Sequence, residues 1–239
     1  MIRLALSVWW LLFVLLSPVL VVQALLTRRR AIRLAPAQGP QSGRVGDGAE
    51  PALRLLLIGE STVAGVGVES QAQGLACCLA QQWAERSGRC VVWQALGENG
   101  ITAAEAVERL LPQVRAQPFD QVLLVFGVND TTHLSSRAGW QHAMQTLVQA
   151  CSESSCRVAF TAVPPIRHFT ALPWLLRQVL GLRACLLDRQ LLQLARQLSV
   201  DHCRIELEFT AQYLARDGYH PSAEGYRVWA RGLADLLWG

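Results

Sequence analysis

At residues 53–62 the chain reads LRLLLIGEST, a largely apolar run that ends in a glycine and a small polar turn. Apolar runs of this length are typical of strands that are buried on both faces of a parallel sheet. Gly59 then allows a tight turn, and Ser61 follows it with a hydroxyl side chain. The stretch therefore predicts a buried strand at 53–58 that presents a hydroxyl group at its carboxyl end.

Strand and helix patterns alternate after this stretch. Apolar runs predict further strands at 90–96, 121–126, 157–162 and 203–207. Helical patterns occur at 71–86, 102–117, 138–151 and 174–197, and a last helix follows a cap at Ser222 and runs to about residue 237. This alternation predicts an α/β fold with a parallel sheet of about five strands and helices on both of its faces.

Four polar motifs occur in a fixed order, and three of them directly follow predicted strands. The carboxyl ends of parallel strands meet at one edge of a sheet, where such folds bind their ligands. We therefore expect the first three motifs to converge there with the fourth, which precedes the last helix. The motifs are Gly59-Glu60-Ser61-Thr62, Gly97-Glu98-Asn99-Gly100, Gly127-Val128-Asn129-Asp130 and Asp217-Gly218-Tyr219-His220-Pro221.

The residue types in these motifs suit acyl transfer through a serine. Ser61 is a candidate nucleophile, and the three-residue spacing of Asp217 and His220 lets the carboxylate orient the imidazole. The Asn129 amide can donate to an oxyanion. Each motif alone also has a structural explanation: Ser61 as a helix cap, Asn129 as a loop residue, Asp130 as a turn or cap residue. Their joint occurrence at one predicted sheet edge favours catalysis.

With these motifs the chain resembles the SGNH/GDSL hydrolase family over residues 53–239. The resemblance implies a three-layer α/β/α, flavodoxin-like sandwich and a serine esterase that needs no cofactor. It implies that Ser61 is the nucleophile and, through its backbone N–H, the first oxyanion donor. Gly100 and Asn129 would be the other two oxyanion donors, and Asp217 and His220 would complete the triad.

One residue departs from the family pattern. The family's first motif is usually Gly-Asp-Ser, whereas this chain has Glu60 before Ser61. Glutamate keeps the charge and adds one methylene group. Because this position is not itself a member of the triad, we expect altered loop packing rather than loss of activity.

The N-terminal segment, residues 1–27, predicts a membrane anchor. Residues 4–26 are apolar except for Ser7, Ser17, Pro18 and Gln23, and this run is long enough to cross a hydrocarbon core of about 30 Å. The alternative is a cleaved signal peptide. The apolar run is longer than is usual for signal peptides, and residues 24–28 make a poor cleavage site. We therefore favour an uncleaved, single-pass anchor.

Arginines follow this segment at positions 28, 29, 30 and 33. Arginines and lysines that flank a membrane segment tend to lie on its cytoplasmic side. These arginines therefore favour a catalytic domain on the cytoplasmic side of the membrane. Residues 28–51 are basic and then rich in proline and glycine, which predicts a linker. The hydrolase domain is expected at 52–239.

Composition excludes several other classes of protein. The net charge of +4 is concentrated beside the apolar segment, and no basic face with interleaved aromatic residues suggests nucleic-acid binding. The seven cysteines include no CxxC pair and lie mostly in apolar patterns, which predicts buried thiols. His133, His142, His168 and His202 are scattered, so we expect surface or packing roles for them and no metal site.

The substrate is less constrained than the reaction. Residues 169–192 form a long apolar stretch after the fourth strand, either a lid that accepts acyl chains or rests on a bilayer, or a helix packed on the sheet. Together with the anchor, the lid would favour a lipid-like or acyl ester. A thioesterase, a carbohydrate O-acetylesterase, an acyltransferase and a catalytically silent binding module on a membrane anchor remain alternatives.

Overall fold

The run at 53–58 lies in β2 (Ala49–Gly59), near the centre of a six-stranded sheet. The structure is a computed structural model that describes residues 2–114, 118–152, 156–205, 210 and 212–237. The strand order is β1-β3-β2-β4-β5-β6. The four strands that continue the sheet in parallel with β2 are β3 (Arg89–Gly97), β4 (Gln121–Val125), β5 (Arg157–Thr161) and β6 (Asp201–Cys203).

Burial along β2 explains why its sequence is a continuous apolar run. Leu55, Leu56, Leu57 and Ile58 are all fully buried. Successive side chains of a strand point to opposite faces. Leu55 and Leu57 therefore join the core on one face of the sheet, and Leu56 and Ile58 join the core on the other.

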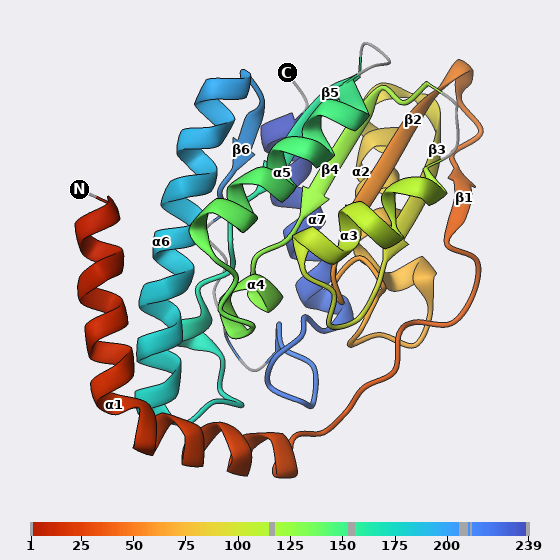
Figure 1. Ribbon diagram of the computed structural model, residues 1–239. Coiled ribbons are helices and arrows are strands. Elements are labelled where there is room, and N and C mark those ends of the chain that lie inside the picture. Colours follow the sequence, from red (N-terminus) through yellow and green to blue (C-terminus); the bar gives the residue numbers. More distant parts are fainter. Residues whose placement is uncertain (1, 115–117, 153–155, 206–209, 211, 238–239) are drawn as a thin grey trace.

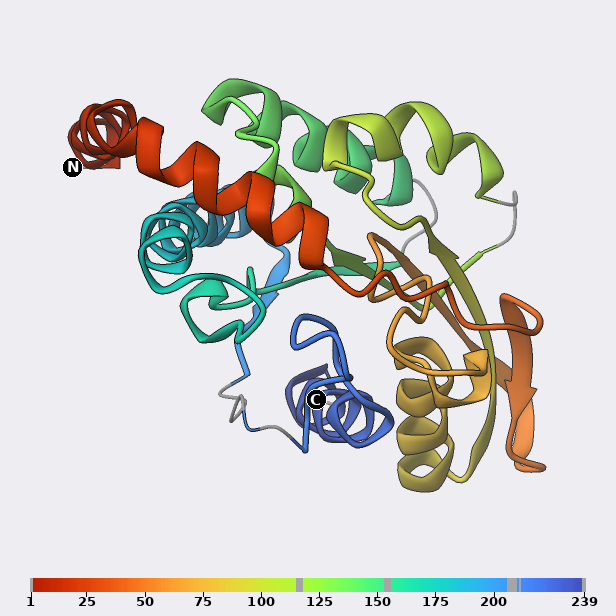
Figure 2. The ribbon, with the colours of Figure 1, turned by 90° about the horizontal axis from the view of Figure 1, so that it is seen from below.

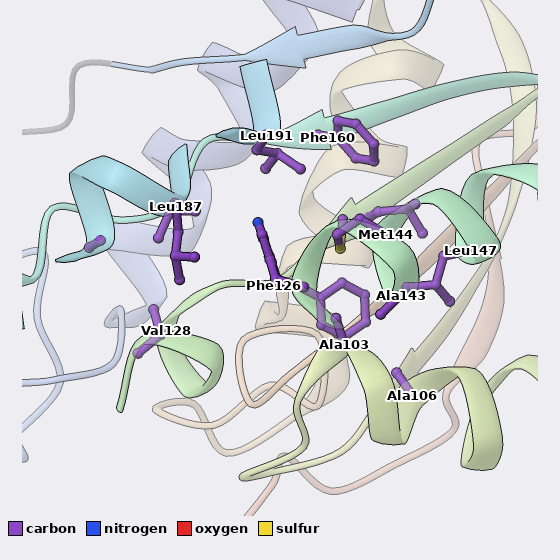
Figure 3. Close-up of a cluster of buried hydrophobic side chains, with 14 of the residues drawn as sticks. Ala103, Ala106, Phe126, Val128, Ala143, Met144, Leu147, Phe160, Leu187 and Leu191 are labelled. Carbon is purple, nitrogen blue, oxygen red and sulfur yellow. The ribbon is translucent and has the colours of Figure 1, made fainter. Parts of the chain in front are cut away.

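Helices cover both faces, so the molecule has three layers (Figures 1 and 2). One face carries α2 (Leu75–Ser87) and α7 (Ala223–Leu237). The other carries α3 (Ala103–Arg109), α5 (Arg137–Ser152) and α6 (Trp174–Leu198). Figure 3 shows part of the second core, in which side chains from α3, α5, β5 and α6 gather with Phe126 and Val128, which follow β4. The predicted α/β/α sandwich is confirmed.

The sheet has one strand more than expected. β1 (Ser42–Val45) pairs antiparallel with residues 91–94 of β3 and lies inside the range 28–51 that we expected to be a linker. β2 also begins within that range, at Ala49. β1 was not predicted because it is short, lies at the edge of the sheet and has no buried residue.

Two other predicted elements differ at their ends. The helix expected at 102–117 is α3 followed by a 3-10 turn, η2 (Leu111–Gln113), and residues 115–117 lie outside the described part. The strand expected at 203–207 is observed at 201–203, and residues 206 and 207 lie outside the described part. α3 begins with a capping box, because the Thr102 hydroxyl accepts from Glu105 N and the Glu105 carboxylate accepts from Thr102 N.

The N-terminal apolar segment forms α1 (Ile2–Arg30), the one helix among the described residues that is long and apolar enough to cross a membrane. A signal sequence or the core helix of a soluble protein can also meet this criterion. Figure 1 shows α1 bent, with its first half beside α6 and its second half across the lower end of the molecule. Pro18 lies inside the helix, and a proline there removes a backbone hydrogen bond and permits such a bend.

Candidate active site

The carboxyl ends of β2, β3 and β4 bring the first three motifs to one edge of the sheet. In the strand register, Gly59 of β2 is paired with Gly97 of β3 on one side and with Val125 of β4 on the other. A Cβ atom on Gly59 would lie 2.4 Å from the Val125 carbonyl oxygen, and one on Gly97 would lie 2.2 Å from Ala64 N. The two glycines therefore allow the turn after β2 to pack closely on its neighbours.

Ser61 lies in this turn, directly after β2. The Glu60 carbonyl accepts hydrogen bonds from Val63 N and Ala64 N, and the Ser61 carbonyl accepts one from Val66 N. These bonds fix the backbone on both sides of the serine, which is only 8% exposed. The first α-helix after Ser61 is α2, which begins at Leu75 after a short 3-10 turn, η1 (Gln71–Gln73).

His220 connects Ser61 to Asp217. The His220 Nε2 atom lies 3.0 Å from Ser61 Oγ, and His220 Nδ1 lies 2.6 Å from Asp217 Oδ2. Because an ionised carboxylate can only accept hydrogen bonds, Nδ1 carries the ring proton and Nε2 is left to accept from the serine hydroxyl. This is the arrangement in which an imidazole can act as a general base toward a hydroxyl group.

Asp217 is held as an anion by its neighbours. Burial alone would raise the pKa of its carboxyl group, but hydrogen bonds from the His220 ring and from the backbone N–H groups of His220 and Tyr219 lower that pKa below its ordinary value. The two backbone bonds, 3.0 and 3.1 Å long, both go to Asp217 Oδ1. The other oxygen is left for the imidazole.

The loop that carries Asp217 and His220 is tied to itself before α7 begins. The His220 carbonyl accepts from Ala215 N, and the Tyr213 carbonyl accepts from Ser222 N. Gly218 has a φ of +65°, a backbone conformation that favours glycine. Ser222 Oγ accepts from Gly225 N at 3.1 Å, as predicted for the cap of the last helix.

The predicted oxyanion donors lie in the three turns next to one another. Gly100 is exposed in the turn after β3, with a φ of +86°. Asn129 is the second residue of the short helix α4 (Val128–Thr132), which follows β4, and it donates from Nδ2 to the Ile101 carbonyl at 3.0 Å. Its amide has a second N–H available. Within the described part of the chain, the N–H groups of Ser61 and Gly100 do not donate to another protein group.

Asp130 lies beside Asn129 within α4 and is the N-cap of neither α3 nor α4, whose N-caps are Thr102 and Gly127. It is buried, accepts from Ala103 N at the start of α3 at 3.0 Å, and accepts from the Ser135 hydroxyl at 2.7 Å. Burial raises the pKa of Asp130, and these two hydrogen bonds oppose the rise. Asp130 thus joins the loop after β3 to the loop after β4.

Glu60 has a contact that sequence reasoning missed. Its side chain is buried, and its two carboxylate oxygens accept from Val128 N at 3.0 Å and from Asn129 N at 2.9 Å. Burial raises the pKa of Glu60 to about 8, against the lowering effect of the two N–H groups. Glu60 therefore links the Ser61 turn to the Asn129 turn. The one signal in the sequence was an acidic residue at the end of a buried apolar run.

A cavity of about 350 Å³ opens beside Ser61 and His220. This volume is within the usual range for small-molecule sites, about 300–1,000 Å³. Its walls are mainly apolar and come from segments that the motifs did not indicate: the chain from 162 to 169, which includes the 3-10 turn η3 (Ile166–His168), residues 203–205, and α7. The lining side chains include Arg167, Phe169, Ile205, Val228 and Trp229.

The histidines other than His220 do not contact Ser61 in the hydrogen bonds described above. His133 and His142 are exposed, and His168 lines the cavity wall. The His202 ring is buried against Asp188 with an Nε2–Oδ1 distance of 2.9 Å, and Arg204 also binds that carboxylate. Burial would raise the pKa of Asp188, but these partners lower it. His202 is thus a buried packing residue against Asp188, which lines the cavity.

Metal and disulfide chemistry find no support in the described residues. They contain no group of three or more His, Cys, Asp or Glu side chains suited to a metal ion. All seven cysteines are free, and five of them are buried. Burial raises the pKa of Cys78 to about 11 and that of Cys151 and Cys203 to about 12, so these thiols stay protonated at neutral pH.

Comparisons with known proteins identify the family of the chain. The sequence model of the GDSL-like Lipase/Acylhydrolase family matches residues 57–228. No curated protein matches the chain. Similar solved structures include the lipase/acylhydrolase from Enterococcus faecalis, which is 18% identical with a TM-score of 0.61 over 77% of this chain and 95% of that chain.

Two further solved structures resemble the chain. The psychrotrophic esterase EstA from Pseudoalteromonas sp. is 18% identical, with a TM-score of 0.58 over 77% of this chain and 96% of that one. A family 3 carbohydrate esterase from Clostridium thermocellum is 13% identical, with a TM-score of 0.60 over 77% and 94%. At these identities the likeness shows the fold, whereas the sequence model shows the family.

Proposed function

The chain belongs to the GDSL-like lipase/acylhydrolase family, and from this premise we propose that it is a serine hydrolase that cleaves carboxylic esters through Ser61, His220 and Asp217. One observation carries the proposal. A continuous chain of hydrogen bonds runs from Ser61 Oγ through both ring nitrogens of His220 to a carboxylate whose pKa is lowered. The site opens into a cavity large enough for a substrate.

The proposed reaction has two steps. Ser61 Oγ attacks the ester carbonyl while His220 Nε2 takes its proton, and Asp217 stabilises the resulting imidazolium. The negative charge on the carbonyl oxygen is held by the N–H groups of Ser61 and Gly100 and by the Asn129 amide. His220 then gives its proton to the departing alcohol. A water molecule, activated by the same imidazole, releases the acyl group from Ser61.

The cavity favours an acyl or lipid-like ester as the substrate. Phe169, Ile205, Val228 and Trp229 supply apolar walls next to Ser61, where the acyl group of a substrate would lie. We further propose that α1 holds the enzyme at a membrane, with the arginines after it favouring the cytoplasmic side. An apolar wall beside the nucleophile suits a medium or long acyl chain better than an acetyl group.

The test compares two esters and one variant, using the full chain in a mild detergent. We expect the protein to hydrolyse p-nitrophenyl octanoate with a higher kcat/KM than p-nitrophenyl acetate, and the Ser61→Ala variant to lose activity on both. Ser152→Ala, at the end of α5 and outside the cavity lining, is the matched control and should retain full activity.

Labelling with a fluorophosphonate separates the remaining alternatives. The wild-type protein should be labelled and Ser61→Ala should not, because the probe reacts only with an activated serine. A folded wild-type protein that is neither labelled nor active would support the silent binding module. A preference for acetate would support a carbohydrate O-acetylesterase. Faster turnover when an alcohol or a thioester replaces the simple ester would support an acyltransferase or a thioesterase.

A further inference from the structure

α1 packs on the rest of the protein along a regular seam. Seven of the described residues of α1 that are at least partly buried recur at alternating intervals of three and four residues, as expected for one face of a helix. Trp9 and Leu20 are almost completely buried in this seam, at 3% and 2% exposure. The seam consists of Leu6, Trp9, Phe13, Leu16, Leu20, Gln23 and Thr27.

Two polar contacts fix the position of α1 against α6. The Trp9 indole Nε1 donates to the Val179 carbonyl at 2.8 Å, and Leu176 N donates to the Gln23 side-chain oxygen at 3.0 Å. Leu176 lies in the first turn of α6, where backbone N–H groups lack partners within the helix. Gln23, one of the few polar residues in the apolar segment, therefore satisfies an orphan donor of another helix.

α1 also covers a buried cation. Arg183 of α6 is 2% exposed, its guanidinium carbon lies 4.8 Å from the centre of the Trp9 ring and 5.4 Å from that of Trp10, and it donates to the Ser135 carbonyl. Detaching α1 would remove both aromatic contacts and expose the apolar seam. Docking is thus favoured strongly over a free helix at the end of a linker.

The other faces of α1 are apolar and exposed. Between Leu4 and Thr27 the helix has no charged residue. Leu4, Leu11 and Leu15 are each 70–73% exposed. On α6, Trp174 and Leu182 are also more than half exposed. Soluble monomers rarely expose so large an apolar surface without a partner. We call the exposed apolar residues of α1, with Trp174 and Leu182, the apolar face.

The second half of α1 and the active site lie toward the same end of the molecule. In Figures 1 and 2 the second half of α1 crosses the end of the molecule at which α4 and the loop before α7 lie, which is the carboxyl edge of the sheet. η3, which contributes Arg167 to the cavity wall, packs on α6 so closely that a Cβ on Gly181 would lie 2.9 Å from Arg167 Cβ.

Positive charge borders the apolar face. Arg28, Arg29, Arg30 and Arg33 are exposed directly after its last apolar turn, and Arg167 is exposed at the rim of the cavity. An apolar surface that covers most of a helix's circumference and ends in arginines matches the acyl region and the anionic headgroups of a bilayer. A second protein would instead be expected to match a narrower apolar stripe.

We propose that the apolar face binds a bilayer containing anionic lipids while α1 stays docked on α6. In this arrangement α1 does not cross the bilayer as a free helix, and the hydrolase domain rests on the bilayer with its active-site edge beside the lipid headgroups. Its substrates are therefore amphiphilic esters that enter from the bilayer. This last point rests on the proposed function; the binding of the face to the membrane does not.

The experiment places a photo-reactive side chain on the domain itself. The full chain, with Leu182→p-benzoylphenylalanine, is reconstituted with vesicles of phosphatidylcholine and phosphatidylglycerol and irradiated. We expect lipid adducts of the protein by mass spectrometry. Leu236, which is 54% exposed on α7 in the opposite layer, is the matched control and should give few or none. Leu11 on α1 is the positive control.

Each other outcome overturns the proposal. Lipid adducts at position 11 without adducts at position 182 would mean that α1 enters the membrane alone and the domain is held away from it. Protein–protein adducts at position 182 would mean that a second copy of the chain covers the face. The same experiment in the Ser61→Ala background should give unchanged adducts, so a failure of membrane binding is distinguishable from a failure of the hydrolase proposal.

The arginines have their own test. Changing Arg28, Arg29 and Arg30 together to glutamine should lower the yield of lipid adducts at position 182 with the anionic vesicles and leave it unchanged with phosphatidylcholine alone. An equal loss with both kinds of vesicle, or no loss with either, would contradict the assignment of anionic headgroups.

Discussion

Asp217 and Glu60 are two carboxylates at the same edge of the sheet, and their surroundings drive their pKa values in opposite directions. Each accepts two backbone N–H groups: Asp217 from Tyr219 and His220, Glu60 from Val128 and Asn129. Burial raises the pKa of Glu60 to about 8, whereas the pKa of Asp217 is lowered. The number of backbone donors is the same for both carboxylates, so it does not explain why their pKa values differ.

The difference comes from the third partner and from depth. Asp217 faces the His220 imidazole at 2.6 Å, and a hydrogen bond to that ring favours the anion. Glu60 is more completely buried, has no cationic partner among the described residues, and lies near Asp130, another carboxylate. Asp217 is thus suited to stabilise a positive charge that forms on His220, and Glu60 is suited to hold two loops together.

The largest expected effect comes from replacing the charged member of the pair. Asp217→Asn should lower kcat about 10⁴-fold, because the amide favours the wrong tautomer of the histidine in a triad of this kind. Hydrolysis of a p-nitrophenyl ester measures the loss. Asp235→Asn is the control, since Asp235 is exposed and pairs with Arg86 far from the cavity. A loss of less than about tenfold would mean that Asp217 is not the partner of the catalytic imidazole.

The contact between Asp217 and His220 could be predicted from the sequence, and so could the position of Ser61 after a strand. Asp217 and His220 are three residues apart, so their contact is local, and Ser61 directly follows an apolar run whose burial on both faces makes it recognisable as a strand. The parallel strands were predicted for the same reason. They are buried on both sides, and their residues carry a strong and continuous signal.

The contacts of Glu60 could not be predicted, because they join residues that are far apart in the sequence. Glu60 meets Val128 across 68 positions, and Trp9 meets Val179 across 170. No local pattern specifies which backbone N–H a buried carboxylate will find. The cavity wall at 203–205 and the edge strand β1 have the same difficulty, since each is short and takes its place only from the neighbours it packs against.

A smaller loss of kcat is expected when Glu60 is changed, because Glu60 holds the backbone of the oxyanion donor Asn129. Asn129→Ala should lower kcat about 10²–10³-fold, the usual cost of removing one oxyanion donor. Glu60→Asp shortens the side chain by a methylene group, which weakens its hold on Val128 N and Asn129 N. It should lower kcat about tenfold with little change in KM, because a misplaced donor acts mainly in the transition state.

The double variant sharpens the distinction between the two carboxylates. If Glu60 acts by positioning Asn129, then Glu60→Asp should have little further effect on kcat in the Asn129→Ala background. Asp217→Asn, which acts through His220, should still cause most of its loss in that background. Independent, multiplicative losses for Glu60→Asp and Asn129→Ala would show that Glu60 does not act through Asn129.

The smallest effect concerns stability and follows from the pKa directions. Glu60 keeps its proton in the folded state up to about pH 8, whereas an unperturbed glutamate with a pKa of 4.5 loses it earlier. Its contribution to folding is therefore complete below about pH 4.5 and is lost as the pH rises to about 8, at up to about 1.4 kcal/mol per pH unit. Asp217 behaves oppositely, because its lowered pKa gives stability that is present above about pH 3.8 and lost on acidification.

Between pH 5 and 8, urea unfolding of the full chain in detergent should thus show a steeper decline in the free energy of unfolding for the wild-type protein than for Glu60→Gln, which cannot titrate. Parallel curves over this range would mean that Glu60 is ionised in the folded protein, and the contrast between the two carboxylates would then lie in their positions alone.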